Sequence, residues 1–149
     1  MRKILLPPVI FFLCIIGIVG VNYLSVTGLV LISGPVKFIG YAMMVVGIFL
    51  PIWGARIFRQ HHTNIIPYKN PDRMVTEGPF RLSRNPMYLG MLLTLIGLAT
   101  LYGTALSFVF PLLYFFVASL YYIPFEEERM IKAFGDDFIA YKAKVRRWI

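Results

Sequence analysis

A polar stretch joins the two apolar halves of this chain, and it reads Gly78-Pro79-Phe80-Arg81-Leu82-Ser83-Arg84-Asn85-Pro86-Met87-Tyr88-Leu89-Gly90. Proline disfavours helix in the residue before it and suits the first helical turn, so a helix is expected to begin at Pro86. Asn85 is a residue type that caps such a helix through its side-chain oxygen. Arg84 then lies at the helix N-terminus, where free N–H groups and a cation together favour an anion.

The composition is that of an integral membrane protein. Hydrophobic residues make up 58% of the 149 residues and charged residues only 15%, whereas soluble domains are about half apolar and about a quarter charged. The length fits a single domain over residues 1–149. The one cysteine, Cys14, lies in an apolar run and has no partner in the chain for a disulfide.

The predicted fold is an all-α integral membrane protein with about four transmembrane helices. Each apolar segment approaches the ~20 residues that a bilayer requires. Tyr102-Gly103-Thr104 separates the last two, so these should form a tight helical hairpin. Residues 22–35 form an expected outer loop, of which residues 26–32 partly enter the membrane interface. The predicted spans are residues 4–22, 37–58, 86–102 and 105–124.

Two polar segments lie outside the spans: a loop at residues 59–85 and a tail at residues 125–149. Pro124 and Phe125 are expected to close the fourth span. In the tail, apolar residues recur at three- and four-residue steps, which predicts an amphipathic helix lying on the membrane, interrupted at Gly135. The apolar face comprises Met130, Phe134, Phe138, Tyr141, Val145 and Trp148.

The charges predict the orientation in the membrane. Every Lys and Arg except Lys37, and all seven acidic residues, lie on the predicted side of the two termini. The positive-inside rule therefore places both termini in the cytoplasm, in a multi-pass protein of a prokaryotic inner or plasma membrane. Topology and contact with anionic membrane lipids account for the net charge of +8, so a nucleic acid partner is not expected.

Two polar clusters flank the predicted hairpin. The first is Arg84-Asn85-Pro86-Met87-Tyr88-Leu89-Gly90, and the second is Glu126-Glu127-Glu128-Arg129. A tight hairpin would bring them together at the cytoplasmic interface, where a cation, N–H groups and carboxylates suit a zwitterionic ligand. Phe80 and Tyr88 could add aromatic surface, and Gly90 could let a ligand lie close to the helix. Alternatively, Arg84 only anchors to headgroups and the acids only favour the tail helix.

The same residues resemble a known signature. Gly78-Pro79-Phe80 and Arg84-Asn85-Pro86-Met87-Tyr88-Leu89-Gly90 resemble the G-P-[YF]…R-H-P-x-Y-x-G signature of the isoprenylcysteine carboxyl methyltransferase and phospholipid methyltransferase superfamily. Its later E-E-x-x-L-x-x-x-F-G-x-x-Y-x-x-Y signature is similar to the residues Glu126-Glu127, Met130, Phe134-Gly135, Phe138 and Tyr141. The resemblance runs from about residue 61 to the C-terminus.

This resemblance implies S-adenosylmethionine as the cofactor, bound at the cytoplasmic ends of the last two spans and covered by the tail. The family usually has histidine where this chain has Asn85. Asparagine does not titrate near neutrality, so capping or cofactor binding carries over to Asn85 but a role as proton acceptor does not. The candidate catalytic residues are Arg84, Asn85 and Glu127. The implied cofactor-binding residues are Arg84, Asn85, Pro86, Tyr88, Gly90, Glu126 and Glu127.

The implied reaction is methyl transfer to a lipophilic small molecule that arrives from the bilayer. The sequence does not decide which molecule accepts the methyl group. The candidates are an isoprenylated cysteine carboxylate, a phospholipid amine and another small hydrophobic thiol or acid. Two other functions also stay open, a membrane reductase using NADPH and a non-enzymatic membrane protein. No metal site is expected, because His61-His62 has no acidic or cysteine partner at ligand spacing. The sequence leaves the oligomeric state open.

Overall fold

The computed structural model describes residues 6–24, 29–61 and 73–149, and its regular elements within these ranges are helices. Three short turns of 3-10 helix occur at Gly34–Val36, Gly78–Arg81 and Ala105–Phe108, and one π-helical turn at Ala118–Tyr122. The α-helices are α1 (Pro7–Tyr23), α2 (Lys37–Gln60), α3 (Pro86–Tyr102), α4 (Val109–Val117), α5 (Ile123–Phe134) and α6 (Asp136–Lys144).

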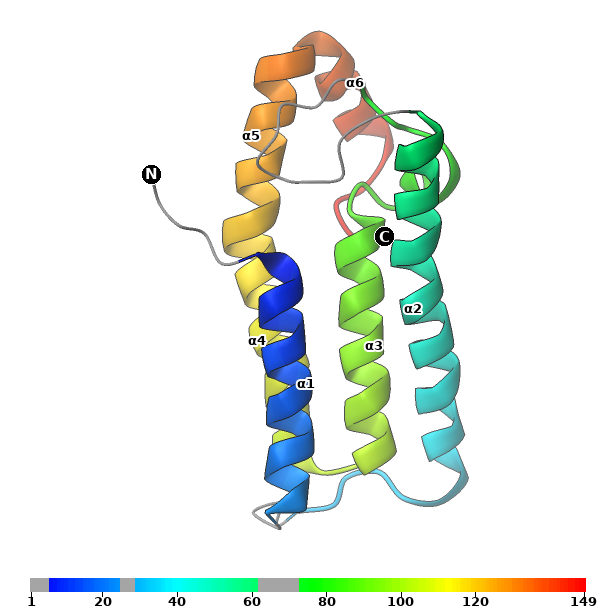
Figure 1. Cartoon of the computed structure of the whole chain (residues 1–149), viewed down its shortest axis with the longest axis vertical. Coiled ribbons are helices and arrows are strands. Elements are labelled where there is room, and N and C mark those ends of the chain that lie inside the picture. The colour runs from blue at the N-terminus through cyan, green and yellow to red at the C-terminus, as the bar shows by residue number, and fades with distance from the viewer. Residues whose placement is uncertain (1–5, 25–28, 62–72) are drawn as a thin grey trace.

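The long helices lie side by side in an elongated bundle, and α6 folds across one end of it (Figure 1). α2 packs along α3, whereas α1 contacts both α3 and α4. The helices α4 and α5 are joined through the π turn into one continuous helix. We call the polar end of the bundle the head, and it comprises residues 56–61, 73–85 and 126–149.

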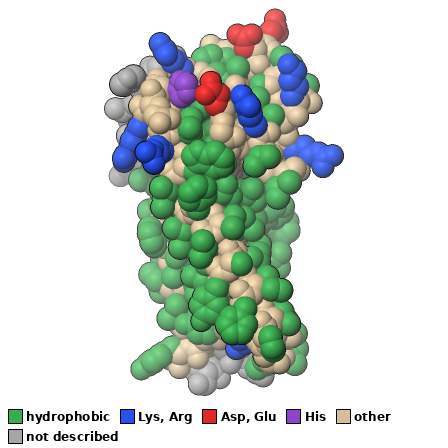
Figure 2. Space-filling model, turned by 90° about the vertical axis from the view of Figure 1, so that its right-hand side faces the viewer, with side chains coloured by type: hydrophobic (Ala, Val, Ile, Leu, Met, Phe, Trp, Pro, Cys, Tyr) green, Lys and Arg blue, Asp and Glu red, His purple; other side chains and the backbone are tan. Residues whose placement is uncertain are grey.

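Below the head, the surface is a belt of hydrophobic side chains (Figure 2). Among the described residues, Lys37 at the far end of α2 is the only charged residue outside the head. An apolar belt beside one strongly charged end is the distribution of a protein that sits in a membrane with its head in water. Large exposed hydrophobic residues of the belt include Phe12, Ile16, Phe38, Val45, Ile52, Leu113 and Leu120.

Two helices are long and apolar enough to cross a membrane, Gly34–Gln60 and Ala105–Phe134. The shorter apolar helices α1 and α3 have 17 residues each. The structure therefore supports an all-helical, membrane-associated protein, while four crossings remain a prediction. Residues 4–5 of the predicted first span, 25–28 of the predicted outer loop and 62–72 of the predicted polar loop lie outside the described residues.

Pro124 and Phe125 are expected to close the fourth span, but the helix itself continues past them to Phe134. A proline ring inside a helix collides with the carbonyl four residues earlier. Here the π turn at Ala118–Tyr122 comes directly before Pro124 and widens the helix where that collision would occur. The apolar part of the helix ends at Phe125, and the residues that follow belong to the head.

The tail makes more contacts with the protein than an amphipathic helix lying on the membrane would. Gly135 interrupts the helix as predicted, with φ of 51°, a conformation that glycine adopts readily. At this point the chain reverses, and α6 returns toward the bundle (Figure 1). Phe138 is 3% exposed, and the Trp148 ring lies 5.3 Å from the ring of Phe115. The apolar tail residues are therefore used partly for packing against the protein itself.

The hairpin between α3 and α4 is confirmed. At the end of the bundle opposite the head, its turn is hydrogen-bonded to the neighbouring segments. Gly103 takes the left-handed conformation (φ 76°) that ends α3. Its carbonyl accepts hydrogen bonds from the N–H groups of Leu31 and Ile32. Asn22 of α1 donates to the Ser107 hydroxyl at 2.7 Å and accepts from Thr104 at 3.0 Å. This network ties α1 to the hairpin.

Glycines bring α2 and α3 into close backbone contact. A Cβ added at Gly40 would lie 2.7 Å from the carbonyl oxygen of Gly97, and one at Gly47 would lie 2.7 Å from that of Gly90. Small residues at regular spacing let helices approach in this way in an apolar environment. The pair α2 and α3 is thus a closely packed unit, and α3 is the helix that begins with the polar stretch.

Replacing Gly97 by alanine is expected to lower the thermal stability of the protein. The new Cβ would lie 2.6 Å from the Gly40 carbonyl oxygen and 2.9 Å from the Met44 nitrogen, and such overpacking costs about 1–3 kcal/mol. Gly20→Ala in α1 is the matched control, because nothing lies within 4 Å of its Cβ position. Thermal unfolding in detergent measures the difference, and equal melting temperatures for the two variants would contradict the close α2–α3 contact.

Candidate functional site

The two polar clusters that flank the hairpin meet in the head, as the sequence predicted. Arg84 precedes α3 and Glu127 lies in α5, and Arg84 Nη2 is 2.9 Å from Glu127 Oε1. The two side chains are only 7% and 9% exposed. A carboxylate and a guanidinium from opposite ends of the hairpin therefore form a buried ion pair at the mouth of α3.

Glu127 is held by three cations in all. Its second oxygen, Oε2, is 3.0 Å from Arg147 Nη2 and 3.3 Å from Lys142 Nζ. Burial raises the pKa of Glu127, but Arg147, Arg84 and Lys142 together lower it by more, so its pKa lies below the usual value. Glu127 is thus a charged carboxylate that holds cations, and it is poorly suited to accept a proton.

The sequence reading missed Lys142 and Arg147, which both come from the tail. They belong to a C-terminal strap, residues 142–148, that lies against the start of α3. The Arg146 carbonyl accepts a hydrogen bond from the Arg84 N–H at 3.0 Å, and the Lys142 carbonyl accepts one from Arg84 Nη1 at 3.3 Å. Basic residues are frequent in the tail, so only the folded chain singles out these two.

Asn85 is the N-terminal flanking residue of α3, but its side chain makes no capping hydrogen bond. Its Nδ2 instead donates to the Arg147 carbonyl at 3.0 Å, and its backbone N–H donates to the Ser83 hydroxyl at 3.1 Å. The expected capping role is therefore wrong. The reason is that the strap offers the Asn85 side chain a carbonyl acceptor, so the side chain holds the strap in place.

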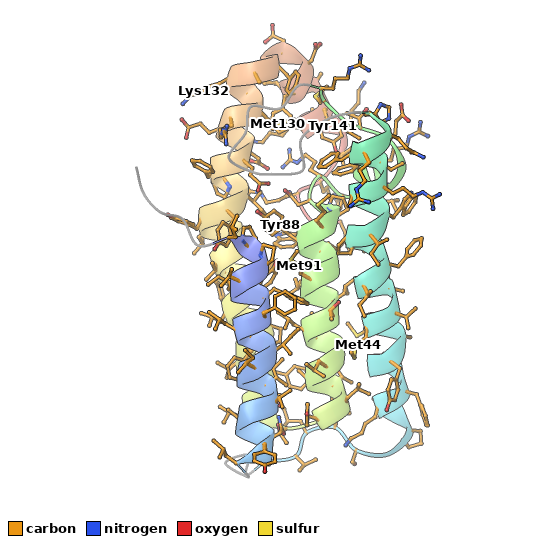
Figure 3. The ribbon with its side chains drawn as sticks, viewed as in Figure 1. Met44, Tyr88, Met91, Met130, Lys132 and Tyr141 are labelled. Carbon is orange, nitrogen blue, oxygen red and sulfur yellow. The ribbon has the colours of Figure 1, made fainter. Side chains whose placement is uncertain are left out.

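Tyr88 and Glu126 form a second polar pair beside the first. The Tyr88 hydroxyl donates to Glu126 Oε1 at 2.6 Å, and the Tyr88 ring stacks with Tyr122 at 6.2 Å. Figure 3 shows Tyr88 and Met91 on the side of α3 that faces the long α4–α5 helix. Burial raises the pKa of Glu126 to about 7, although the Tyr88 hydrogen bond and Arg129 oppose this shift. Glu126, unlike Glu127, can gain or lose a proton near neutral pH.

Gly90 and Phe80 were expected to contact a ligand, but both are used for packing against α2. The position of a Gly90 Cβ is filled by Pro51 and by the Gly47 carbonyl of α2. Phe80 is 6% exposed and stacks on Phe58 with ring centres 4.9 Å apart. Neither presents the open surface that the sequence reading expected of it, because α2 packs too closely against this part of the chain. Pro86, the first residue of α3, is buried.

One polar atom of the site lacks a partner. Arg84 Nε is buried and makes no hydrogen bond in the part of the chain that the structure describes. A buried donor without an acceptor is unfavourable by about 1–3 kcal/mol. Arg84 Nε is therefore a donor of this site that a ligand oxygen would satisfy.

Metal-ligating residues do not gather at this site. His61 Nε2 lies 3.7 Å from Glu77, and His62 lies outside the described residues. Across the described ranges, no three His, Cys, Asp or Glu side chains come together as a metal would require. What the described head provides is a set of cations, carboxylates and tyrosines, which suits a ligand carrying both charges.

Comparisons with known proteins point to one family. A family model described as phospholipid methyltransferase matches residues 35–137, a range that holds Arg84, Glu126 and Glu127. An uncharacterised protein of Haemophilus influenzae is 35% identical over 63 residues, which are 42% of this chain and 100% of that protein. Lys142 and Arg147 lie beyond the range that the family model matches.

Replacing Glu127 by glutamine is expected to destabilise the fold, because three cations lose their common carboxylate. Breaking a buried ion pair costs roughly 3–5 kcal/mol. Since the pKa of Glu127 is lowered in the folded state, its contribution is present above the usual carboxyl pKa and is lost as the pH falls below it. The melting temperatures of wild type and Glu127→Gln should therefore differ at pH 7 and converge in acid.

Glu128→Gln is the control for this experiment. Glu128 pairs with Lys132 at the surface, where their side chains are 64% and 72% exposed, and exposed pairs contribute about 0–1 kcal/mol. A melting temperature for Glu127→Gln as close to wild type as that of Glu128→Gln would show that the cluster does not stabilise the head.

Proposed function

The chain belongs to the phospholipid methyltransferase family, and we propose that it transfers a methyl group from S-adenosylmethionine to a lipophilic acceptor. Family membership indicates methyltransferase chemistry in a membrane protein. The cofactor, the acceptor and the cytoplasmic orientation are parts of the proposal. The observation that carries it is the meeting of Arg84, Glu127, Tyr88 and Glu126 at the head end of the apolar helices.

The charged groups of the head fit the amino acid part of the cofactor. Arg84, with its unpaired Nε, and Arg147 would hold the carboxylate. Glu127 would hold the ammonium group. In the described structure Arg84 and Glu127 pair with each other, so a zwitterionic ligand would exchange one set of opposite charges for another. Such an exchange leaves no buried charge without a partner.

The reaction itself asks little of the protein. When bound, S-adenosylmethionine supplies a methyl group that its sulfonium already activates. The residues of the chain must orient the acceptor in line with that methyl group and exclude water. The stacked Tyr88 and Tyr122 rings and the buried Tyr114, whose hydroxyl lies 3.1 Å from Met91 Sδ, provide a largely apolar interior beside Glu126.

The acceptor would come from the membrane and the cofactor from the cytoplasm. The apolar belt ends where the head begins (Figure 2), so Tyr88 and Glu126 lie near the level that separates lipid from water. The proposed topology has four crossings and places both termini in the cytoplasm, because positive charge gathers at the head. A lipid can then reach the site without leaving the bilayer.

Arg84→Ala is expected to weaken S-adenosylmethionine binding by roughly 10- to 100-fold, because a charged ligand group loses its hydrogen-bonded partner. Isothermal titration in detergent measures this, and Arg59→Ala, which removes an exposed cation of α2, should bind like wild type. The melting temperature without ligand shows whether Arg84→Ala is folded. Binding of NADPH, with no binding of S-adenosylmethionine or its demethylated product, would overturn the proposal in favour of a reductase.

The acceptor class can be read from the role of Glu126. A carboxylate or thiolate attacks without help, whereas a protonated amine must first lose a proton, and Glu126 is the carboxylate able to accept it. Transfer of labelled methyl groups to an amine lipid should fall as the pH drops through about 7, where Glu126 becomes protonated.

Glu126→Gln should abolish transfer to the amine lipid and leave transfer to a prenylcysteine carboxylate largely intact. Total lipid extract and a prenylcysteine analogue are the two acceptors to compare. Glu128→Gln, which changes an exposed neighbour, is the control. Full amine methylation by a folded Glu126→Gln variant would exclude Glu126 as the base.

A further inference from the structure

A surface pocket of about 350 Å³ lies between α6 and the segment that precedes α3. α6 presents one face to this pocket through Asp137, Ala140, Tyr141 and Lys144, which recur at three- and four-residue steps. The opposite wall is the segment that leads into α3. The full set of lining residues is Met74, Thr76, Arg81, Asp137, Ala140, Tyr141, Lys144 and Val145.

The residues that line this pocket differ from those proposed to bind the methyl donor. Phe138 and Lys142 are one helical turn apart on the other side of α6, where Phe138 is buried and Lys142 contacts Glu127. Tyr141 also lines the pocket, and its hydroxyl donates to the Phe80 carbonyl at 2.6 Å. α6 thus stands between a charged interior cluster and an open pocket.

Two cations of the pocket have no acidic partner. Arg81 and Lys144 are both exposed, and neither forms an ion pair with an acid among the described residues. Asp137 is the one acid of the lining and also lies in the first turn of α6, where a carboxylate is favoured. With two cations against one acid, the pocket attracts an anion.

The position of the pocket indicates which anion it meets. Arg81 is followed by Leu82, whose side chain is exposed, and five residues later the apolar helix α3 begins at Pro86. Lys and Arg side chains gather at the level where the apolar belt ends (Figure 2). Anions are concentrated at this level in a membrane as phospholipid headgroups. Met74, Ala140 and Val145 give the pocket apolar lining for the uncharged part of a lipid.

We propose that this pocket binds the headgroup of an anionic phospholipid, with Arg81 and Lys144 holding the phosphate. This site is additional to the methyl-transfer site and does not depend on it. A bound headgroup would connect α6 to the segment before α3 across the pocket. The same helix carries Lys142 to Glu127, so the lipid would stabilise the head in its described arrangement.

The test measures binding of fluorescent phosphatidylglycerol to the purified full-length protein in detergent, without methyl donor. Arg81→Gln/Lys144→Gln should bind roughly tenfold more weakly, as expected for the loss of two basic contacts to an anionic headgroup. Arg59→Gln/Lys132→Gln removes the same charge from exposed positions outside the pocket lining and should retain nearly the wild-type affinity. Melting curves establish that both double variants are folded.

Asp137→Asn gives a second test with the opposite sign. Removing this acid should tighten phosphatidylglycerol binding, whereas Asp136→Asn, in the same helical turn but outside the lining, should not.

Equal weakening of phosphatidylglycerol binding in the two double variants would overturn the site. Tighter binding of phosphatidylcholine that is lost in Asp137→Asn would assign a zwitterionic headgroup instead. Displacement by inorganic phosphate as effective as that by the lipid would assign free phosphate.

Because the readout is lipid binding, failure of this experiment leaves the methyl-transfer proposal intact. Conversely, a protein that binds phosphatidylglycerol through Arg81 and Lys144 but never binds S-adenosylmethionine would support the pocket and overturn the proposed activity.

Discussion

The head of this protein depends on one buried carboxylate. Glu127 has Arg84, Lys142 and Arg147 around it, and these residues come from the start of α3 and from the last residues of the chain. A buried charge is tolerated only when its partners are in place, so the carboxylate links the formation of the hairpin to the docking of the tail. The strap hydrogen bonds to Arg84 and Asn85 follow from the same requirement. The hydrogen-bonded Tyr88 and Glu126 lie beside this cluster, since Glu126 is the neighbour of Glu127 and Tyr88 lies one helical turn after Arg84.

The bundle divides into a rigid part and an adaptable part. α2 and α3 meet through glycines and backbone carbonyls, which leaves no room between them for a lipid chain. On the other side of α3, the contacts with α1 and α4 are made by larger side chains, and Gly17 accommodates the ring of Phe110. Side chains can change rotamer, whereas touching backbones cannot. Under the proposed function, a lipophilic acceptor would therefore reach Tyr88 and Glu126 from the side of α4 and α5.

Much of the fold could be predicted from the sequence, and the failures have physical causes. Pro86 and Gly103 mark the ends of α3 because each has a backbone preference that acts locally, and the hairpin then brings Arg84 to Glu127. The path of the tail could not be predicted, since the same apolar periodicity serves a helix that lies on lipid and a pair of helices folded onto protein. Lys142 and Arg147 were missed because only the reversal at Gly135 selects them among the basic residues of the tail. The continuation past Pro124 depends on a π turn, which has no clear sequence signal.

That π turn also rotates the side chains of α5 about the helix axis relative to those of α4. A π turn holds one more residue than an ordinary turn would, and one residue corresponds to about 100° of rotation around an α-helix. The orientation of Glu126 and Glu127 around the helix is therefore offset from that of the apolar residues before Ala118. The bundle can keep the helical face that packs against α1 and α3, while the head presents a different face to Tyr88 and Arg84. A single inserted residue thus lets the packing against α1 and α3 and the polar contacts of the head share one continuous helix.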